Sequence, residues 1–454
     1  MTTKPVTFKE IQATFEKFLL LEDKNFIRLT YATIIGNQMP SQRPIWLMLV
    51  APSSSGKTTA LNAFNGLKLK NPASGEMMEP THNISDLTEN SFASGMNRGD
   101  KQTSLLHKMP YGGVMVFKDF TSMISKNEQS RMTIMGQLRE IYDGAYTKRT
   151  GNGEDVLWNG KIGAIAGVTE AIFQHMESMS AMGDRFVLYQ VQQPDRVQVT
   201  KYKINQINTG VTEYSIMPTL KKMTEEYLQR AFDAMSKSEN IKLELNEKEV
   251  DEIVAVADFC TMVRSGLNID KYRNRITFVP TPEMPMRMFE QMYAIAISFM
   301  FMRKLDDPNC SNEIPKEDFA VIYKIAFDSI PVVRRIALQY LTLYDGGVTT
   351  AALARKINYE SEIVSGWLAQ LNSLGVVKRI KHSSGGNAWV LEERFRTVME
   401  RLNHVKALGK SLGDDDEIES DDVDRHWNTN KDYEKTFDSH NEFTSKEADE
   451  NDEW

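Results

Sequence analysis

Cysteine is scarce in this chain, since only Cys260 and Cys310 occur among its 454 residues, far apart in the sequence. Two distant cysteines exclude a disulfide framework, and their spacing does not match that of zinc ligands. The first residues lack the apolar core of a secretory leader. The most apolar stretch, 288–302, is shorter than a bilayer requires and contains Glu290. We therefore expect a protein of a reducing cytosol without a membrane anchor.

Acidic residues are unevenly distributed. Residues 411–454 contain 17 acids and 4 bases, a net charge of −13, whereas the whole chain carries −8, so that residues 1–410 are mildly basic. An acidic tail that is poor in branched apolar residues is expected to be disordered. The tail holds five aromatic residues: Trp427, Tyr433, Phe437, Phe443 and Trp454. Such a tail could dock in a basic groove of a protein partner or compete with nucleic acid for a basic channel. The alternative is a tail that only increases solubility.

The strongest motif lies at residues 45–59. A continuous apolar run at 45–50 predicts a strand covered on both faces. The small residues after it let backbone N–H groups surround phosphate oxygens, while Lys57 supplies a cation and Thr58 a hydroxyl ligand for Mg²⁺. Ala51 replaces the first glycine of the usual pattern, and a chance Gly-Lys-Thr is the alternative. The predicted nucleotide contacts are Ser53, Ser54, Ser55, Gly56, Lys57, Thr58 and Thr59.

A second buried strand, 112–118, is followed by a carboxylate at Asp119. Many nucleotide-hydrolysing proteins end such a strand with two acids, one for Mg²⁺ and one that orients the attacking water. Here Lys118 occupies the place of the first acid. We expect Asp119 to act in catalysis and as a metal ligand; an ordinary strand with a polar turn is the alternative.

Further strands at 162–168 and 186–189 alternate with helical segments, which predicts a three-layer α/β domain. The first of these strands ends at Thr169, and Arg185 directly precedes the second. Between the helix at 128–141 and Thr169, residues 146–158 predict a β-hairpin around a Gly-Asn-Gly turn. Lys148 and Arg149 lie close to its tip.

The pattern turns helical from 218 to about 329. Arg287 lies at the start of an apolar helix, where a cation is unfavourable unless a phosphate is near. Residues 332–391 follow as three short helices and a hairpin, the pattern of a winged helix-turn-helix. The expected groove helix, 361–374, has no Lys or Arg, while the hairpin carries Lys378, Arg379 and Lys381. Base reading, phosphate contact and protein contact all remain open.

The order of these parts resembles that of an AAA+ ATPase. The hairpin before Thr169 and the Asp-Arg-Phe at 184–186 are similar to the pre-sensor-1 hairpin branch, which includes the minichromosome maintenance helicases. The likeness covers about residues 20–395 and lacks an N-terminal oligonucleotide-binding domain. The chain also looks like AAA+ proteins of phages and mobile elements, in which a Lys-Asp-Phe-Thr segment, here at 118–121, replaces the usual paired acids. The implied division is an N-terminal helical prelude (1–40), an α/β core (41–215), a helical lid (216–330), a winged helix (331–395), and a helix end with a disordered acidic tail (396–454).

The resemblance implies ATP and Mg²⁺ as cofactors. It gives Asp119 the role of positioning the attacking water, Thr169 the sensor-1 role and Arg287 the sensor-2 role. Arg185 is then a finger that reaches a neighbouring subunit. A ring-shaped homo-oligomer such as a hexamer follows, with Lys148 and Arg149 facing DNA in its channel. The implied setting is the cytosol of a bacterium or a phage-infected host.

Two functions are compatible with this resemblance. The first is an ATP-hydrolysing helicase, translocase or DNA remodeller in phage or mobile-element replication, which the basic hairpin favours. The second is a slowly hydrolysing, nucleotide-gated helicase loader or transcriptional regulator, which Lys118 favours.

Overall fold

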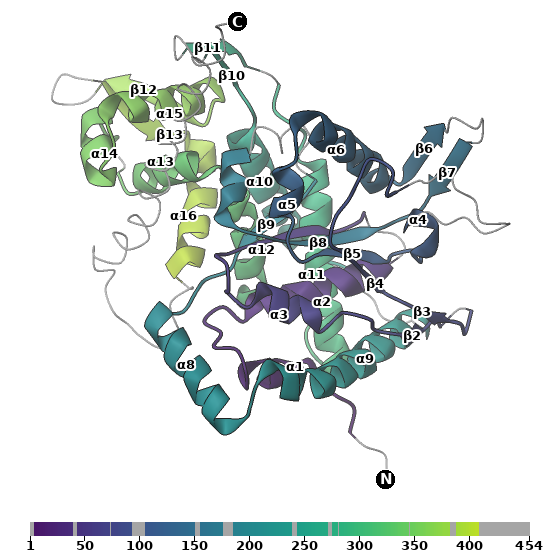
Figure 1. Ribbon diagram of the computed structural model, residues 1–454. Helices are drawn as coiled ribbons and strands as arrows, with labels where there is room; N and C mark the ends of the chain where they lie inside the picture. The colour runs from purple at the N-terminus through teal and green to yellow at the C-terminus, as the bar shows by residue number, and fades with distance from the viewer. Residues whose placement is uncertain are drawn as a thin grey trace, which may run out of the picture.

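A five-stranded parallel sheet forms the centre of the computed structural model, which describes residues 4–39, 43–72, 74–92, 105–149, 155–175, 185–237, 243–270, 275–279, 281–344, 346–381 and 387–407 (Figure 1). The strand order is β4-β5-β8-β1-β9, and all four neighbouring pairs are parallel. The strands are β1 (Trp46–Val50), β4 (Thr81–Ile84), β5 (Val114–Phe117), β8 (Gly163–Val168) and β9 (Val187–Gln190). The predicted α/β core is confirmed.

Helices cover both faces of this sheet. Successive residues of a strand point to opposite faces, so each strand can contribute to two hydrophobic clusters. Trp46 and Met48 of β1 pack in one hydrophobic cluster, with helices of the 105–142 region, while Leu47 and Leu49 pack in another. The first face carries α4 (Leu105–Lys108), α5 (Thr121–Ile124) and α6 (Glu128–Tyr142). The second carries α1 (Phe8–Glu16), α2 (Asn25–Gln38), α3 (Lys57–Asn62), α9 (Glu213–Lys237) and α11 (Met286–Asp306).

The helices expected to form a prelude and a lid share hydrophobic clusters either with the sheet or with the C-terminal residues 336–402. Residues of α1, α2, α9, α11 and α12 (Lys316–Asp328) belong to the same cluster as one face of β1. Buried Asp318 accepts hydrogen bonds from both Arg28 and Arg303, which ties three of these helices together. Residues 216–330 therefore do not form a hydrophobic core of their own. The remaining elements of this part are α8 (Arg196–Thr209), α10 (Glu247–Arg264), β10 (Asn268–Asp270) and β11 (Arg275–Phe278).

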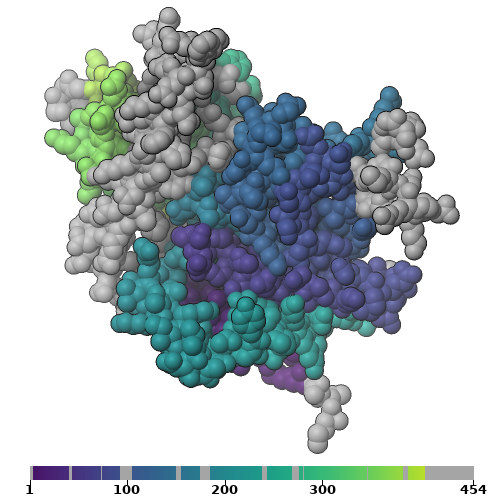
Figure 2. Space-filling view, viewed as in Figure 1, coloured from purple at the N-terminus to yellow at the C-terminus, as the bar shows by residue number. Residues whose placement is uncertain are grey.

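The sequence did not indicate α8 or the β10–β11 hairpin. Figure 2 shows α8 and α9, in teal, at the surface along the bottom of the view. The predicted hairpin at 146–158 is confirmed as β6 (Ala145–Arg149) paired antiparallel with β7 (Asp155–Asn159); its tip lies outside the described residues. Short elements complete this half: β2 (Leu69–Lys70), β3 (Met77–Met78) and the 3₁₀ helix η1 (Glu170–His175).

A C-terminal unit of helices and one hairpin follows, on the opposite side of the view from β6 and β7 (Figure 1). It comprises α13 (Val332–Thr342), α14 (Thr350–Ile357), α15 (Ser361–Ser373), β12 (Val377–Lys381), β13 (Asn387–Leu391) and α16 (Glu393–Ala407). The first three helices and the hairpin lie within a few residues of their predicted positions. The acidic tail lies outside the described residues. In the described part of the chain, no helix combines the length and the apolar character that a membrane span requires.

Gly163 offers a test of this packing. A Cβ at Gly163 would lie 2.1 Å from Nδ2 of buried Asn37, whose amide donates to the carbonyls of Thr33 and Ile45 and cannot easily move. We expect Gly163→Ala to lower the free energy of unfolding by about 1–3 kcal/mol. Gly136→Ala, in α6 where an added Cβ meets nothing within 4 Å, should raise it by up to about 1 kcal/mol. Urea denaturation that finds the two variants equally stable would contradict this packing.

Candidate active site

The loop at residues 51–56 joins the carboxyl end of β1 to the start of α3. Ser54 and Gly56 both have left-handed backbone conformations, with φ of 65° and 85°. Glycine adopts this region readily, and a Cβ at Gly56 would meet Leu19 at 3.1 Å. Serine rarely does, and residues held in such conformations cluster at functional sites. The two left-handed residues turn the chain sharply between β1 and α3.

Lys57 is buried inside this loop. Its ammonium donates hydrogen bonds to the carbonyl of Ala51, to the carbonyl of Pro52 at 2.8 Å and to Ser55 Oγ at 3.1 Å. Burial lowers the pKa of Lys57 to about 8, while the nearby carboxylates of Asp119 and Glu170 oppose the shift. The three oxygen acceptors are neutral groups of the loop itself, so anionic phosphate oxygens can replace them with a gain in electrostatic energy.

The two threonines after Lys57 differ in environment. Thr58 is exposed at the start of α3. Thr59 Oγ1 donates to Glu213 Oε2 at 2.9 Å, and Asn62 donates to the other oxygen of the same carboxylate at 3.1 Å. Glu213, which the sequence did not single out, thus fixes α3 against the start of α9. Of the two threonines, Thr58 is the one whose hydroxyl is open to a ligand.

Asp119 and Thr169 lie at the same edge of the sheet as this loop. The N–H of Ala51 donates to the carbonyl of Val168, which places Thr169 directly beside the start of the loop. The chain after β5 is linked to the end of β8, since the backbone N–H of Thr169 donates to Thr121 Oγ1 at 3.4 Å. The backbone N–H of Thr121 in turn donates to Asp119 Oδ1 at 3.0 Å. The loop, Asp119 and Thr169, which the sequence singled out separately, therefore lie close together at one edge of the sheet.

Glu170 is a second carboxylate at this edge that the sequence prediction missed. It is half-buried, and burial raises its pKa, while Lys57 and Arg335 act in the opposite direction. An acid directly after a buried strand was the available signal, because residues that follow parallel strands meet at one edge.

Arg335 brings the C-terminal unit to the same edge. Its guanidinium donates to Asp328 at 3.1 Å and to Gln190 Oε1, at the end of β9, also at 3.1 Å. Asp328 in turn accepts the N–H of Gln190 at 2.8 Å. Burial lowers the pKa of Arg335, and the carboxylates of Asp328 and Glu170 oppose this shift. A helix of the last unit is therefore joined to the strand next to β1.

The strand order also marks this edge. The connection from β1 runs to β4, past β8 and β5, whereas the connection from β8 crosses β1 to reach β9. Connections that leave neighbouring strands in opposite directions open a crevice outside their carboxyl ends, where open α/β sheets bind ligands.

Arg185 and Arg287 lie at the other edge. Arg185 precedes β9 and is held by Asp143 at 2.6 Å, with 7% of its side chain exposed. Arg287 forms an ion pair with Glu283 at 2.9 Å. It lies one helical turn before Gln291, whose side-chain oxygen accepts the N–H of Trp46 at the start of β1. The length of β1, about 13 Å at 3.3 Å per residue, separates this edge from the loop.

A single chain therefore does not bring either arginine to its own phosphate loop. For Arg287, the position does not fit a sensor at the nucleotide of the same chain. For Arg185, a role in a neighbouring subunit's site requires its guanidinium to exchange Asp143 for phosphate oxygens.

The cations predicted to contact nucleic acid form two separate groups. On the hairpin, Lys148 donates to Asn90 Oδ1 at 2.6 Å, and Arg149, with 88% of its side chain exposed, lies 3.8 Å from Asp155 across the pair. On the C-terminal unit, Lys378 lies 3.4 Å from Glu392, and the guanidinium of Arg379 lies over the ring of Trp389; Lys381 is exposed at the end of β12. Arg149 and Lys381 are the most available of the five.

No protein-family model matches this chain, and no curated protein matches it either. In the described residues, no group of three or more His, Cys, Asp or Glu is arranged to hold a metal ion. Mg²⁺ that arrives with a nucleotide is commonly held by one or two protein groups and by substrate phosphates. Thr58 and Asp119 are the residues that would hold it.

Proposed function

We propose that the protein binds ATP with Mg²⁺ at the carboxyl edge of the sheet and hydrolyses it. The observation that carries this proposal is the convergence of the Lys57 loop with Asp119 and Glu170 at the switch point between β1 and β8. A cation for phosphate and two carboxylates for metal and water are what phosphoryl transfer to water requires.

Each residue has a definite part in this mechanism. The loop N–H groups and Lys57 would bind the phosphates, and Thr58 with Asp119 would hold Mg²⁺, which would neutralise charge on the phosphate oxygens. Thr169 lies beside the loop and orients the terminal phosphate. Glu170 suits the role of the group that orients water and accepts its proton, since a carboxylate with a raised pKa is a better base near neutral pH.

Glu170 bears on the choice between the two candidate functions. Lys118 replaces one acid of the usual pair, which favours slow hydrolysis. Glu170 supplies a second carboxylate from the neighbouring strand and favours turnover. We therefore place the DNA-dependent motor or remodeller first, as a cytosolic ring-shaped homo-oligomer with a winged-helix unit. The nucleotide-gated loader or regulator is the second candidate, supported by the link from Arg335 to β9.

A steady-state ATPase assay with and without single-stranded DNA separates these candidates. The motor requires that DNA raise the rate of phosphate release. A rate that DNA leaves unchanged, in a protein that nevertheless assembles with ATP, would favour the gated loader or regulator.

The hairpin prediction concerns Lys148 and Arg149. Replacing both with alanine should weaken binding to single-stranded DNA and reduce the slope of log affinity against log salt by about 1–2, because up to two phosphate contacts are lost. Fluorescence anisotropy at several salt concentrations measures this. ATP affinity should not change, and unchanged DNA affinity would remove the hairpin from the DNA path.

The affinity for ATP should also depend on pH through Lys57. The pKa of this ammonium is about 8 without ligand, and bound phosphate would raise it further, so the contribution to binding is complete below this pKa and is lost as the pH rises. Affinity should fall about 10-fold between about pH 7 and pH 9. Lys57→Arg keeps its charge throughout and should give a flat profile. A flat profile for the unaltered protein would contradict this role of Lys57.

A further inference from the structure

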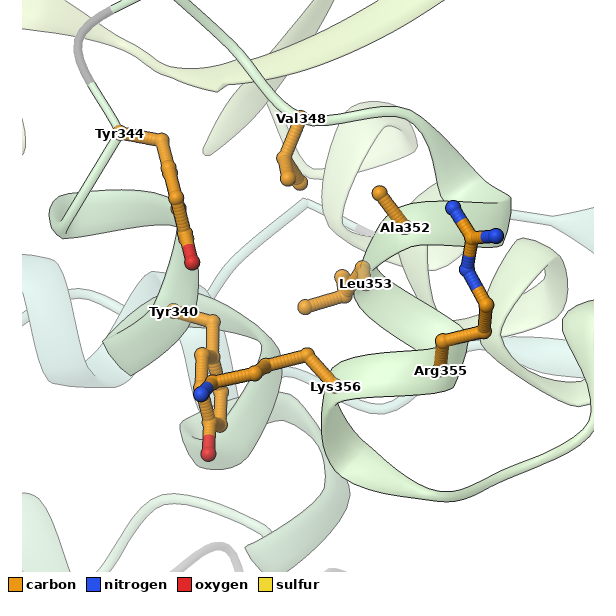
Figure 3. Close-up of a pocket in the computed structure, with 7 residues that line it drawn as sticks. All are labelled: Tyr340, Tyr344, Val348, Ala352, Leu353, Arg355 and Lys356. Carbon is orange, nitrogen blue, oxygen red and sulfur yellow. The ribbon is translucent and has the colours of Figure 1, made fainter. Parts of the chain in front are cut away.

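A cavity of about 360 Å³ lies on the C-terminal unit, between the end of α13 and α14. Its lining residues are Tyr340, Tyr344, Val348, Ala352, Leu353, Arg355 and Lys356. Figure 3 shows the two tyrosines on one side and the α14 residues on the other, with the Lys356 side chain extending toward Tyr340. The cavity thus has aromatic and aliphatic walls and a cationic rim.

The rim is open to solvent and carries positive charge. Arg355 and Lys356 are exposed in the last turn of α14, and 40% of Tyr344 is exposed. No acidic residue is among those that line the cavity. A pocket of this kind suits an aromatic side chain whose neighbours in sequence are carboxylates, because the ring fills the apolar part while the acids reach the cations.

The acidic tail of this chain has that composition. Residues 411–454 carry a net charge of −13. Four of their five aromatic residues adjoin an acid, as in Asp432-Tyr433-Glu434 and Glu442-Phe443.

The tail also starts within reach. The described chain ends in α16, which packs against α13, the helix that supplies Tyr340. Residues 408–454 span up to about 3.3–3.6 Å each, so the cavity is accessible to the tail of the same chain.

We propose that the acidic tail, residues 411–454, docks on its own C-terminal unit in this cavity. An aromatic side chain of the tail inserts beside Tyr340 and Tyr344, and neighbouring carboxylates pair with Arg355 and Lys356. The docked tail neutralises part of the positive charge of the unit. Because the contacts at the rim are solvent-exposed ion pairs, docking weakens as salt is added.

A second basic and apolar surface provides a matched control. The helix α8 carries exposed Lys201 and Lys203 beside exposed Ile204 and Ile207, and none of these residues lines the cavity. Reversing Lys201 and Lys203 changes the net charge by the same amount as reversing Arg355 and Lys356. A tail attracted by positive charge alone would respond to both changes.

Two measurements on the full-length chain test the proposal. In the first, a carbodiimide that joins amines to carboxylates should link Lys356 to acids of the tail. A mixture of isotopically light and heavy chains shows whether the joined residues belong to one molecule. Cross-links that occur only between molecules, or none from Lys356 to the tail, would overturn docking on the same chain.

The second measurement is the rate of tryptic cleavage at Lys431, Lys435 and Lys446. Reversal of both rim charges, Arg355→Glu with Lys356→Glu, should accelerate cleavage about 10-fold. Tyr344→Ala should act in the same direction, and its exposed position makes loss of folding a poor explanation. Lys201→Glu with Lys203→Glu should leave the rate unchanged. Equal rates in the rim variant and the unaltered protein, or equal acceleration by the α8 control, would exclude the cavity as the docking site.

Discussion

Lys57→Ala is expected to weaken ATP binding at least about 100-fold, a loss of about 2.7 kcal/mol. The reason is the position of the ammonium, which is buried in the loop and already surrounded by three oxygen acceptors. Hydrogen bonds from a charged donor contribute about 1.5–3 kcal/mol each, and phosphate oxygens would take over more than one of them. Isothermal titration calorimetry with ATP and Mg²⁺ measures the change.

Lys68→Ala is the matched control for this variant. Lys68 is exposed shortly after α3. Its backbone N–H donates a hydrogen bond to Glu225, and the substitution keeps this N–H. Its ATP affinity should equal that of the unaltered protein. An unchanged affinity in Lys57→Ala, or an equal loss in both variants, would contradict the assignment of the loop.

The second large effect concerns hydrolysis. Asp119→Asn and Glu170→Gln should each lower the rate of phosphate release about 10²–10⁴-fold, the range that removal of a positioned acid or base usually produces. Glu170→Gln should leave ATP affinity nearly unchanged, because the neutral amide preserves shape and Glu170 acts on water. Asp119→Asn should also raise the Mg²⁺ concentration needed for binding. A malachite-green assay of released phosphate, combined with Mg²⁺ titrations, measures both.

Glu128→Gln serves as the control for these variants, since Glu128 is exposed at the start of α6. Full hydrolysis in the Asp119 variant, without any response to DNA, would exclude the motor. Full hydrolysis in the Glu170 variant would return the role of the base to Asp119.

The sheet and its edge were accessible from the sequence because their signals are local. Trp46 to Val50 form one uninterrupted apolar run, as a strand covered by two layers of helices requires. The hairpin and the C-terminal helices are likewise marked by turn residues and by helical periodicity. Asp119 and Thr169 follow strands of the same sheet, so their convergence with the loop follows from parallel topology alone.

The remaining features depend on contacts between distant residues. Glu213 anchors α3 from 151 positions away, and Arg335 reaches Gln190 across 145 positions. No periodicity in the sequence records such pairs. The position of Arg185 was partly predictable, because a residue that precedes a parallel strand lies at the amino edge. The shared core of the expected lid could not be predicted, since amphipathic helices do not show which surface they cover.

Hydrogen–deuterium exchange with and without ATP and Mg²⁺ tests the central claim most directly, because it locates the nucleotide in the unaltered protein. We expect slower exchange at residues 51–60, at 118–121 and at 168–171, together with the adjoining end of β9. The same experiment on Lys57→Ala should show no change at the same ATP concentration. Protection confined to other parts of the chain, or no protection at these four segments when ATP is bound, would contradict a nucleotide site at the carboxyl edge of the sheet.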